Sequence, residues 1–308
     1  MLSALAVGVA AALEAAVGEP PTRYHPVAWF GSLVAPLDQE WRSDAHAFAA
    51  GGLGALVLPL FAALAVGASV ALAETLSPMA GALAAGLALF LTTSLRELLV
   101  AARSVVADSE TDPEAARDGL LALVGRDAAG LSPGLLRSAA VESAAENLAD
   151  GLVASLGAFV LGAALAPLAG LPALPVAAAV AAWVKAVNTM DSMLGYRSKR
   201  VGTPAARLDD AVMWLPARAS ALLLAVAFAD PRSLVRARGW LSRVSSPNSG
   251  WPMGAVAAAL DARLEKPGVY LLNASADLPD RTAAQRGVRG VGRAGLLAYA
   301  LGGVLAWF

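Results

Sequence analysis

Acidic side chains recur along "VESAAENLADG", residues 141 to 151, which ends where a long uncharged run begins. Glu142, Glu146 and Asp150 are spaced four residues apart, so in an α-helix they share one face. Like charges at this spacing repel one another, and a bound cation removes the repulsion. Hard cations such as Mg²⁺ prefer carboxylate oxygens together with substrate phosphates. The spacing favours a metal site with Glu146 and Asp150 as ligands; the alternative is a solvated acidic face paired with arginines elsewhere.

Other polar blocks follow the apolar stretches of the chain. They are "KAVNTMDSMLGYRSKR" (185–200), "RLDDAVMWLPARAS" (207–220) and "SSPNSGWP" (245–252). Polar groups at the edge of a membrane span are costly unless they are paired or functional, which makes Asn188 and Asp191 candidates for a site. Lys185 has a simpler alternative, in which its side chain extends toward the membrane surface. The last block reads as a turn whose backbone N–H groups are predicted to face an anion.

A histidine lies near the N-terminus, in the Pro-rich segment "GEPPTRYHPVAWFG" (18–31). A neutral imidazole can accept a proton from a substrate, which makes His25 a candidate base. A lone histidine followed by proline is more often structural, and that alternative stays open.

The elements that must position these groups are membrane helices. Hydrophobic residues make up 57% of the 308 residues, charged residues 15%, and the mean hydropathy is +0.61. Uncharged stretches run over 48–73, 75–95 and 151–184, and about 20 apolar residues in a helix cross a bilayer core. The third stretch is too long for one span and carries prolines near its middle, so we expect it to fold back. Two terminal segments, 1–17 and 294–308, complete a predicted path of six spans.

Basic residues predict the orientation of this path. Apart from Arg96 and Lys185, which directly follow spans, the basic residues fall within 18–47, 101–150 and 191–293, and a six-span path puts these segments on one side. Loops near spans on the cytoplasmic side are rich in Lys and Arg, so that side is predicted to be the cytoplasm. The apolar stretch 215–229 agrees with this orientation only if it does not cross the membrane, as a re-entrant or surface helix. The alternative is that it forms a further span. We therefore predict an all-α, multi-pass helical protein of the cell membrane, forming a single domain over 1–308, with cytoplasmic loops.

Two compositional facts exclude whole classes of chemistry. The chain has no cysteine, which excludes disulfides, thiolate metal sites and cysteine nucleophiles. Its formal net charge of −1 argues against a nucleic-acid-binding surface.

Six ordered blocks together resemble the CobD/CbiB family, the adenosylcobinamide-phosphate synthases of cobalamin biosynthesis. They are "GEPPTRYHPVAWFG", "LVGRDAAGL", "VESAAENLADG", "KAVNTMDSMLGYRSKR", "RLDDAVMWLPAR" and "SPNSGWPMGAVAAAL", and they run nearly end to end. The resemblance implies a membrane enzyme that joins an aminopropanol phosphate, or a related amino-alcohol phosphate, to the propionate carboxylate of adenosylcobyric acid, with ATP and Mg²⁺. The sequence departs from the family pattern at Glu19, where Asp is usual, at Ala28, where Arg is frequent, and at Met213, where Asn is common.

The implied reaction gives the polar residues expected roles. Activation of a carboxylate by ATP gathers negative charge, which metal ions and basic side chains stabilise. The predicted catalytic residues are Glu142, Glu146, Asn147, Asp150, Asp191, Asp209, Asp210 and His25. The predicted substrate-binding residues are Lys185, Asn188, Tyr196, Arg197, Arg218, Pro247 and Asn248. The expected partners are adenosylcobyric acid, the amino-alcohol phosphate and the lipid bilayer, and a homo-oligomer is left open.

Two other classes of function compete with this reading. One is a membrane sensor without catalysis, as in AmpE-like relatives, and it predicts loss of the acidic blocks. The other is a transporter, which predicts ionisable groups in the middle of spans.

Overall fold

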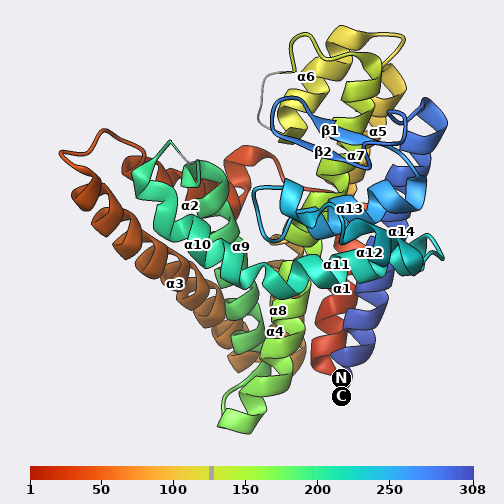
Figure 1. Cartoon of the computed structure of the whole chain (residues 1–308). Coiled ribbons are helices and arrows are strands. Elements are labelled where there is room, and N and C mark those ends of the chain that lie inside the picture. Colours follow the sequence, from red (N-terminus) through yellow and green to blue (C-terminus); the bar gives the residue numbers. More distant parts are fainter. Residues whose placement is uncertain (125–127, 197) are drawn as a thin grey trace. The chain divides into compact units, whose positions relative to one another are not determined.

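The computed structural model describes residues 1–124, 128–196 and 198–308 and is mostly helical (Figure 1). It divides into two compact units that are interleaved along the chain. Unit 1 contains residues 1–94, 150–213 and 299–308, and unit 2 contains 95–149 and 214–298. The predicted single domain over 1–308 stays a prediction, and the units are described one at a time.

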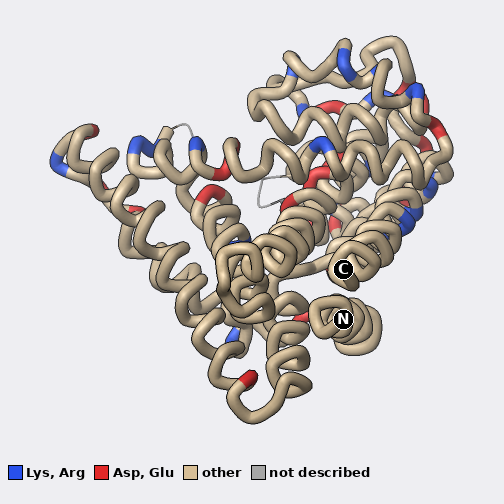
Figure 2. Tube along the Cα trace, turned by 90° about the horizontal axis from the view of Figure 1, so that it is seen from below, with Lys and Arg blue, Asp and Glu red and all other residues tan. Residues whose placement is uncertain are grey.

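Unit 1 is a bundle of long apolar helices. Its elements are α1 (Leu2–Ala16), η1 (Thr22–Tyr24), α2 (Pro26–Val34), η2 (Ala35–Leu37), α3 (Asp44–Leu76), α4 (Pro78–Phe90), most of the π-helix η3 (Ala149–Val153), α8 (Ala154–Leu165), η4 (Ala166–Ala169), α9 (Ala173–Leu194), η5 (Arg200–Gly202), α10 (Thr203–Val212) and the end of α14 (Arg281–Leu305). Helix α9 packs against α3 and α8, while α4 packs against α1 and α3. Figure 2 shows α3 as a nearly uninterrupted tan stretch, because its only charged residues are Asp44 and Glu74.

Small residues let these helices approach closely, as is usual where lipid surrounds a bundle. A Cβ added at Gly162 of α8 would lie 2.9 Å from the Cα of Ala177 of α9. At Gly51 of α3, an added Cβ would lie 1.9 Å from the carbonyl oxygen of Val201 in η5. Glycine is therefore required at both contacts.

Four helices in the described part of the chain are long and apolar enough to cross a membrane. They are Asp44–Leu76, Pro78–Asp108, Pro133–Ala169 and Ala173–Leu194. A fifth is added if Arg200–Val212 and Trp214–Ala227 count as one broken span. The chain is thus a multi-pass helical membrane protein, as predicted, and the third uncharged stretch does fold back between α8 and α9.

The predicted path of six spans is not confirmed, because neither terminal segment is among the candidates. Helix α1 has 15 residues, about 22 Å at 1.5 Å per residue, which is short of a core about 30 Å thick. The apolar end of α14 is shorter still, since charged residues continue up to Arg293.

Unit 2 combines helices with one small hairpin. Its elements are α5 (Leu95–Asp108), α6 (Pro113–Val124), α7 (Pro133–Leu148), the first residue of η3, α11 (Trp214–Ala227), α12 (Arg232–Ala237), η6 (Leu241–Arg243), α13 (Gly250–Leu260), β1 (Leu264–Lys266), β2 (Tyr270–Leu272) and most of α14. The strands are antiparallel, with Leu264 opposite Leu272. Helix α7 packs against α5, α6, α13 and β1. Ser132 followed by Pro133 predicts a helix start, because Ser is common at the N-cap and Pro at the first helical position. The structure confirms it, since Ser132 caps α7 by accepting a hydrogen bond from the backbone N–H of Leu135 at 3.3 Å.

Labelling of single cysteines tests whether α11 crosses the membrane. Thr111 and Ser245 are both exposed, and the two spans Pro133–Ala169 and Ala173–Leu194 lie between them in the sequence. If α11 is re-entrant, an impermeant thiol reagent applied to intact cells should label neither Thr111→Cys nor Ser245→Cys, because the predicted orientation puts both residues on the cytoplasmic side. Labelling of Ser245→Cys alone would show that α11 crosses.

Candidate functional site

The predicted site residues are divided between the two units. Unit 1 holds His25, Asp150, Lys185, Asn188, Asp191, Tyr196, Asp209 and Asp210. Unit 2 holds Glu142, Glu146, Asn147, Arg218, Pro247 and Asn248. Arg197 lies outside the described residues.

A pocket of about 350 Å³ in unit 1, here called the polar pocket, gathers several of these residues. It lies between the 18–25 segment, the start of α2, the loop after α4 and the middle of α9. Its polar lining residues are Glu19, Thr22, His25, Thr93, Ser94, Lys185 and Thr189. Its volume is at the small end of the range for ligand pockets, which suits a molecule much smaller than a corrinoid.

Lys185 is the only lysine or arginine among the described residues that line the polar pocket. It is also the first charged residue along α9, about 18 Å from the start of that helix. The carboxylates of Asp150 and Glu19 lie close enough to stabilise its charge. A ligand that carries both a negative and a positive group matches this arrangement, since its negative group can bind Lys185 and its positive group can lie toward the carboxylates.

His25 begins helix α2 and caps it. The Nδ1 atom of its ring accepts a hydrogen bond from the backbone N–H of Val27 at 3.2 Å. Burial and the nearby charge of Lys185 lower the pKa of His25 below its usual value, so the ring stays neutral at pH 7. A neutral ring that accepts at Nδ1 carries its proton at Nε2. In this arrangement His25 can donate a hydrogen bond through Nε2. To act as the predicted base, its Nδ1 atom must first lose the hydrogen bond from the N–H of Val27.

The loop Leu91–Ser94, at the floor of the polar pocket, rests on a buried chain of hydroxyl groups. Tyr299 donates from its hydroxyl to Thr93 Oγ1 at 3.1 Å, and Thr93 Oγ1 lies 3.2 Å from Glu14 Oε2. All three side chains are nearly inaccessible to solvent. The N–H of Ser94 then donates to the carbonyl oxygen of Gly151 at 2.9 Å, directly after Asp150. The buried chain thus holds the segment that presents Asp150 to Lys185.

Sequence reasoning assigned no role to this chain of hydroxyls. Thr93 and Tyr299 are isolated polar residues in apolar helices, and 206 residues separate them. The one available signal was Glu14, an acid inside an otherwise uncharged helix, because such a group is costly in a membrane unless it is paired.

Thr93→Val should lower activity by disturbing Asp150, whereas Thr93→Ser should retain it. Valine matches the shape of threonine but leaves Glu14 and Tyr299 without their shared partner, at a cost of about 1–3 kcal/mol. We expect the valine variant to accumulate in membranes at a reduced level and to have a raised KM for the ligand of the polar pocket. Equal KM values in the valine and serine variants would show that the hydroxyl chain is purely structural.

A second group of polar residues in unit 1 joins α9 and α10. Asn188 Nδ2 donates to Asp209 Oδ1 at 3.5 Å, and both side chains are buried. Asp191 lies near the like charge of Asp210. An added Cβ at Gly195 would lie 1.9 Å from Asp191 Oδ1, so glycine leaves room for that carboxylate. The structure brings these four predicted residues together, whereas Tyr196 is 56% exposed.

In unit 2, Glu142 is bound within the protein. It is 2% exposed, and its carboxylate accepts hydrogen bonds from Ser138 Oγ and from the hydroxyl of Tyr270 in β2, each at 2.5 Å. Ser138 Oγ in turn accepts from the N–H of Glu265 in β1 at 2.8 Å. These contacts fasten the hairpin to α7, which gives Glu142 a structural role.

The expected shared face of Glu142, Glu146 and Asp150 stays a prediction. Helix α7 ends at Leu148, and Asp150 lies in the π-helix η3, so the type of helix changes between Glu146 and Asp150. Glu146 and Asn147 are half-buried, and the Asn147 amide donates to the carbonyl oxygen of Ser143 at 3.0 Å. Within the described ranges, no group of three or more His, Asp or Glu residues could hold a metal ion. The pairing of Glu146 with Asp150 around a metal stays a prediction.

The Arg218 side chain lies among aromatic rings in unit 2. Its guanidinium stacks over Trp214 at 4.3 Å and Trp251 at 5.3 Å, and it donates to Asn248 Oδ1 at 3.1 Å. The contact of the turn before α13 with an anion stays a prediction. Two of its backbone N–H groups, those of Asn248 and Ser249, donate to Ser246 Oγ at 3.2 and 3.5 Å. Pro247 is exposed.

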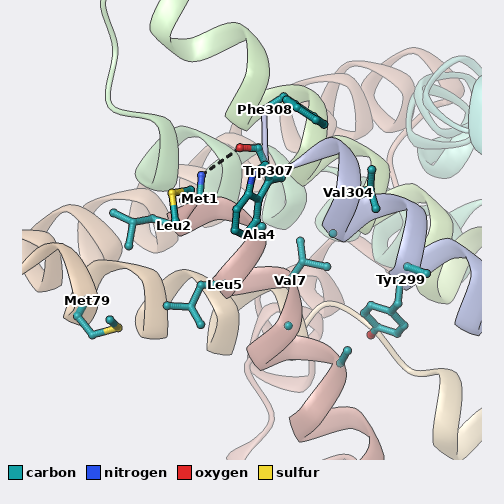
Figure 3. Close-up of a pocket in the computed structure, with 14 residues that line it drawn as sticks. Met1, Leu2, Ala4, Leu5, Val7, Met79, Tyr299, Val304, Trp307 and Phe308 are labelled. Atoms are coloured by element: carbon teal, nitrogen blue, oxygen red, sulfur yellow. Dashed lines mark hydrogen bonds between the residues drawn. The ribbon is translucent and has the colours of Figure 1, made fainter.

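Another pocket of unit 1, about 940 Å³, is mostly apolar (Figure 3). It is formed by α1, Met79 and the 299–308 segment, where the N-terminal ammonium of Met1 donates to the carbonyl oxygen of Trp307 at 3.2 Å. Its described lining residues have no acidic or basic side chain.

Comparison with known proteins gives a consistent assignment. The model of the CobD/Cbib protein family matches residues 7–291. A probable cobalamin biosynthesis protein CobD of Methanothrix thermoacetophila is 36% identical, over 95% of this chain and 93% of its own. The CobD of Klebsiella pneumoniae subsp. pneumoniae is 36% identical, over 87% and 84%, and the CbiB of Salmonella arizonae is 34% identical over the same shares. No solved structure matches the chain. With a family model that spans nearly the whole sequence and relatives above 30% identity, the chain belongs to the CobD/CbiB family of cobalamin biosynthesis proteins.

Proposed function

We propose that the protein joins an amino-alcohol phosphate, such as aminopropanol phosphate, to the propionate carboxylate of adenosylcobyric acid, forming adenosylcobinamide phosphate at the expense of ATP. Membership of the CobD/CbiB family indicates the pathway, which is cobalamin biosynthesis. The observation that carries the proposal is the polar pocket, which Lys185 and Glu19 both line, while the carboxylate of Asp150 acts on the charge of Lys185 from outside its lining. An amino-alcohol phosphate has a phosphate at one end and an ammonium at the other, and this arrangement of charges matches both.

Within the polar pocket each group has a proposed task. The ammonium of Lys185 and the Nε2–H of His25 bind the phosphate, because charge-assisted hydrogen bonds are the strong ones. Asp150 and Glu19 bind the ammonium, and one of them accepts its proton so that the nitrogen lone pair becomes available.

The carboxylate of the corrinoid must be activated before the amine can attack it. Its oxygen takes a phosphoryl or adenylyl group from ATP; the amine nitrogen then bonds to the acyl carbon, and phosphate or AMP leaves. Mg²⁺ is proposed only as the companion of ATP, since the described residues contain no metal cluster. The roles predicted for Glu146, Asn147, Asp191, Asp209, Asp210, Arg218 and Asn248 are proposals for binding ATP and the corrinoid. The cytoplasmic orientation of these groups is likewise proposed, on the distribution of basic residues.

The test is product formation by the purified protein in lipid nanodiscs. With adenosylcobyric acid, aminopropanol phosphate, ATP and Mg²⁺, mass spectrometry should detect adenosylcobinamide phosphate, and the nucleotide product distinguishes the two activation routes. The free amino alcohol should react poorly, because Lys185 then has no phosphate to bind. Equal use of both amines would contradict the phosphate site. Absence of product with either would favour a non-catalytic AmpE-like sensor.

A further inference from the structure

A second pocket of unit 1, here called the apolar pocket, adjoins the polar pocket. It also has a volume of about 350 Å³ and lies between α2, α3, α4 and α9. Val27, Leu91, Lys185 and Thr189 line both pockets. The two volumes therefore meet at Lys185, and one ligand can occupy both.

The apolar pocket offers no polar group except at this junction. Lys185 is its only charged lining residue among those described. The hydroxyl groups of Ser69, Thr92 and Thr189 each donate to a backbone carbonyl oxygen of their own chain segment, at 2.8 Å in each case. A hydrocarbon chain fits such a lining, whereas a polar molecule would lose its hydrogen bonds to water without replacement.

The apolar pocket is reached from the bilayer. Its walls α3, α4 and α9 belong to candidate membrane spans. Leu87 is 47% exposed, and Ala65 and Ser69 are also exposed on the pocket's outer edge. In a membrane these residues face lipid, so an acyl chain can enter sideways between α3 and α4.

We infer that the joined pockets bind a phospholipid whose head group is a phosphorylated amino alcohol, namely a phosphatidylethanolamine. Its acyl chain occupies the apolar pocket, its phosphate contacts Lys185, and its ammonium contacts Glu19, the acid that lines the polar pocket. Complementary charge selects this head group, because its phosphate is opposite in sign to Lys185 and its ammonium is opposite in sign to Glu19. The inference rests on the proposed function in one respect, since the head group occupies the place of the substrate amine.

Competition between lipid and substrate follows from shared occupancy. In membranes that contain phosphatidylethanolamine, the KM for the amine phosphate should rise while kcat stays unchanged. The rise is about twofold when the lipid is present at its dissociation constant and about fivefold at four times that level. The protein would thus respond to the composition of its own membrane.

The experiment compares nanodiscs of phosphatidylcholine with nanodiscs in which half of that lipid is replaced by phosphatidylethanolamine or phosphatidylglycerol. Phosphatidylcholine has no N–H donor, and phosphatidylglycerol has no amine. We expect KM to rise only with phosphatidylethanolamine. Native mass spectrometry of the detergent-purified protein, without substrates, should show one retained phosphatidylethanolamine. Equal retention of all three lipids would overturn the head-group assignment, and retention of none would overturn the site.

A matched pair of substitutions on α3 tests the place of the acyl chain. Ala65→Phe fills the apolar pocket from its exposed edge, whereas Ala68→Phe adds the same side chain to an exposed position of α3 that does not line it. The first should abolish lipid retention and the KM shift, and the second should change neither. If no membrane supports product formation but phosphatidylethanolamine is retained and Ala65→Phe removes it, the proposed reaction fails and the lipid site stands.

Discussion

Lys185→Met is expected to lower kcat/KM for the amino-alcohol phosphate by roughly 10- to 150-fold, the equivalent of about 1.5–3 kcal/mol for one charge-assisted hydrogen bond. Methionine has nearly the same length and keeps the apolar contacts of the lysine stem, so the loss should come from the missing charge. The same variant removes the positive charge on which the carboxylates of Asp150 and Glu19 act, and the negative charge that remains further weakens binding of the phosphate.

The matched control for this prediction is Lys199→Met. Lys199 makes a surface ion pair with Asp38 at 2.7 Å, and its side chain is not part of the polar pocket. Surface ion pairs contribute little, so kcat/KM should stay within a factor of about two of the unmodified protein. The measurement is initial rate against amine concentration for both variants in the same nanodiscs. Loss of activity toward the free amino alcohol by the same factor as toward the phosphate would mean that Lys185 acts elsewhere.

Gly51→Ala should prevent unit 1 from folding normally. The added methyl group would lie 1.9 Å from the carbonyl oxygen of Val201, and neither helix backbone can move away without disturbing the packing of α3 on α9 and η5. Overpacking of this kind costs typically 1–3 kcal/mol or more, a large part of the stability of an average domain. We expect little monodisperse protein after extraction from membranes, and a clearly lowered Tm for what remains.

The adjacent residue provides the control. A Cβ at Gly52 would meet only Pro204 Cγ, at 4.0 Å, which is an ordinary contact. Because alanine favours helix over glycine by about 0.5–1 kcal/mol, Gly52→Ala should be neutral or stabilising. If Gly51→Ala gave the same yield and Tm as Gly52→Ala, the close approach of α3 to η5 would be disproved.

The sequence predicts well those features that a single local property determines. Uncharged stretches long enough for a bilayer fall within the candidate spans Asp44–Leu76, Pro78–Asp108, Pro133–Ala169 and Ala173–Leu194, because membrane thickness fixes the length of a spanning helix. Ser132 and Pro133 marked the start of α7, because capping depends on adjacent residues. The same reasoning counted the two terminal segments as spans. Both are apolar, but neither is among the candidate spans, because α1 and the apolar end of α14 are short for a bilayer core.

Properties that depend on distant residues were not predictable in this way. Glu142 appeared to belong to an acidic face, yet its hydrogen-bond partner Tyr270 is 128 residues away. The turn at 245–252 has the composition of an anion site, but Ser246 Oγ already accepts from its N–H groups. No local pattern of residues shows which partner a side chain finds after folding.

The order of synthesis determines when the Glu14–Thr93–Tyr299 chain of hydrogen bonds can form. Thr93 emerges from the ribosome 206 residues before Tyr299, an interval of about 10–40 s at 5–20 residues per second. During that time Glu14 and Thr93 lack the hydroxyl group of Tyr299. The chain of hydroxyl groups beneath the polar pocket is therefore complete only after α14 has been synthesised, so the last helix of the sequence finishes a contact that begins in the first.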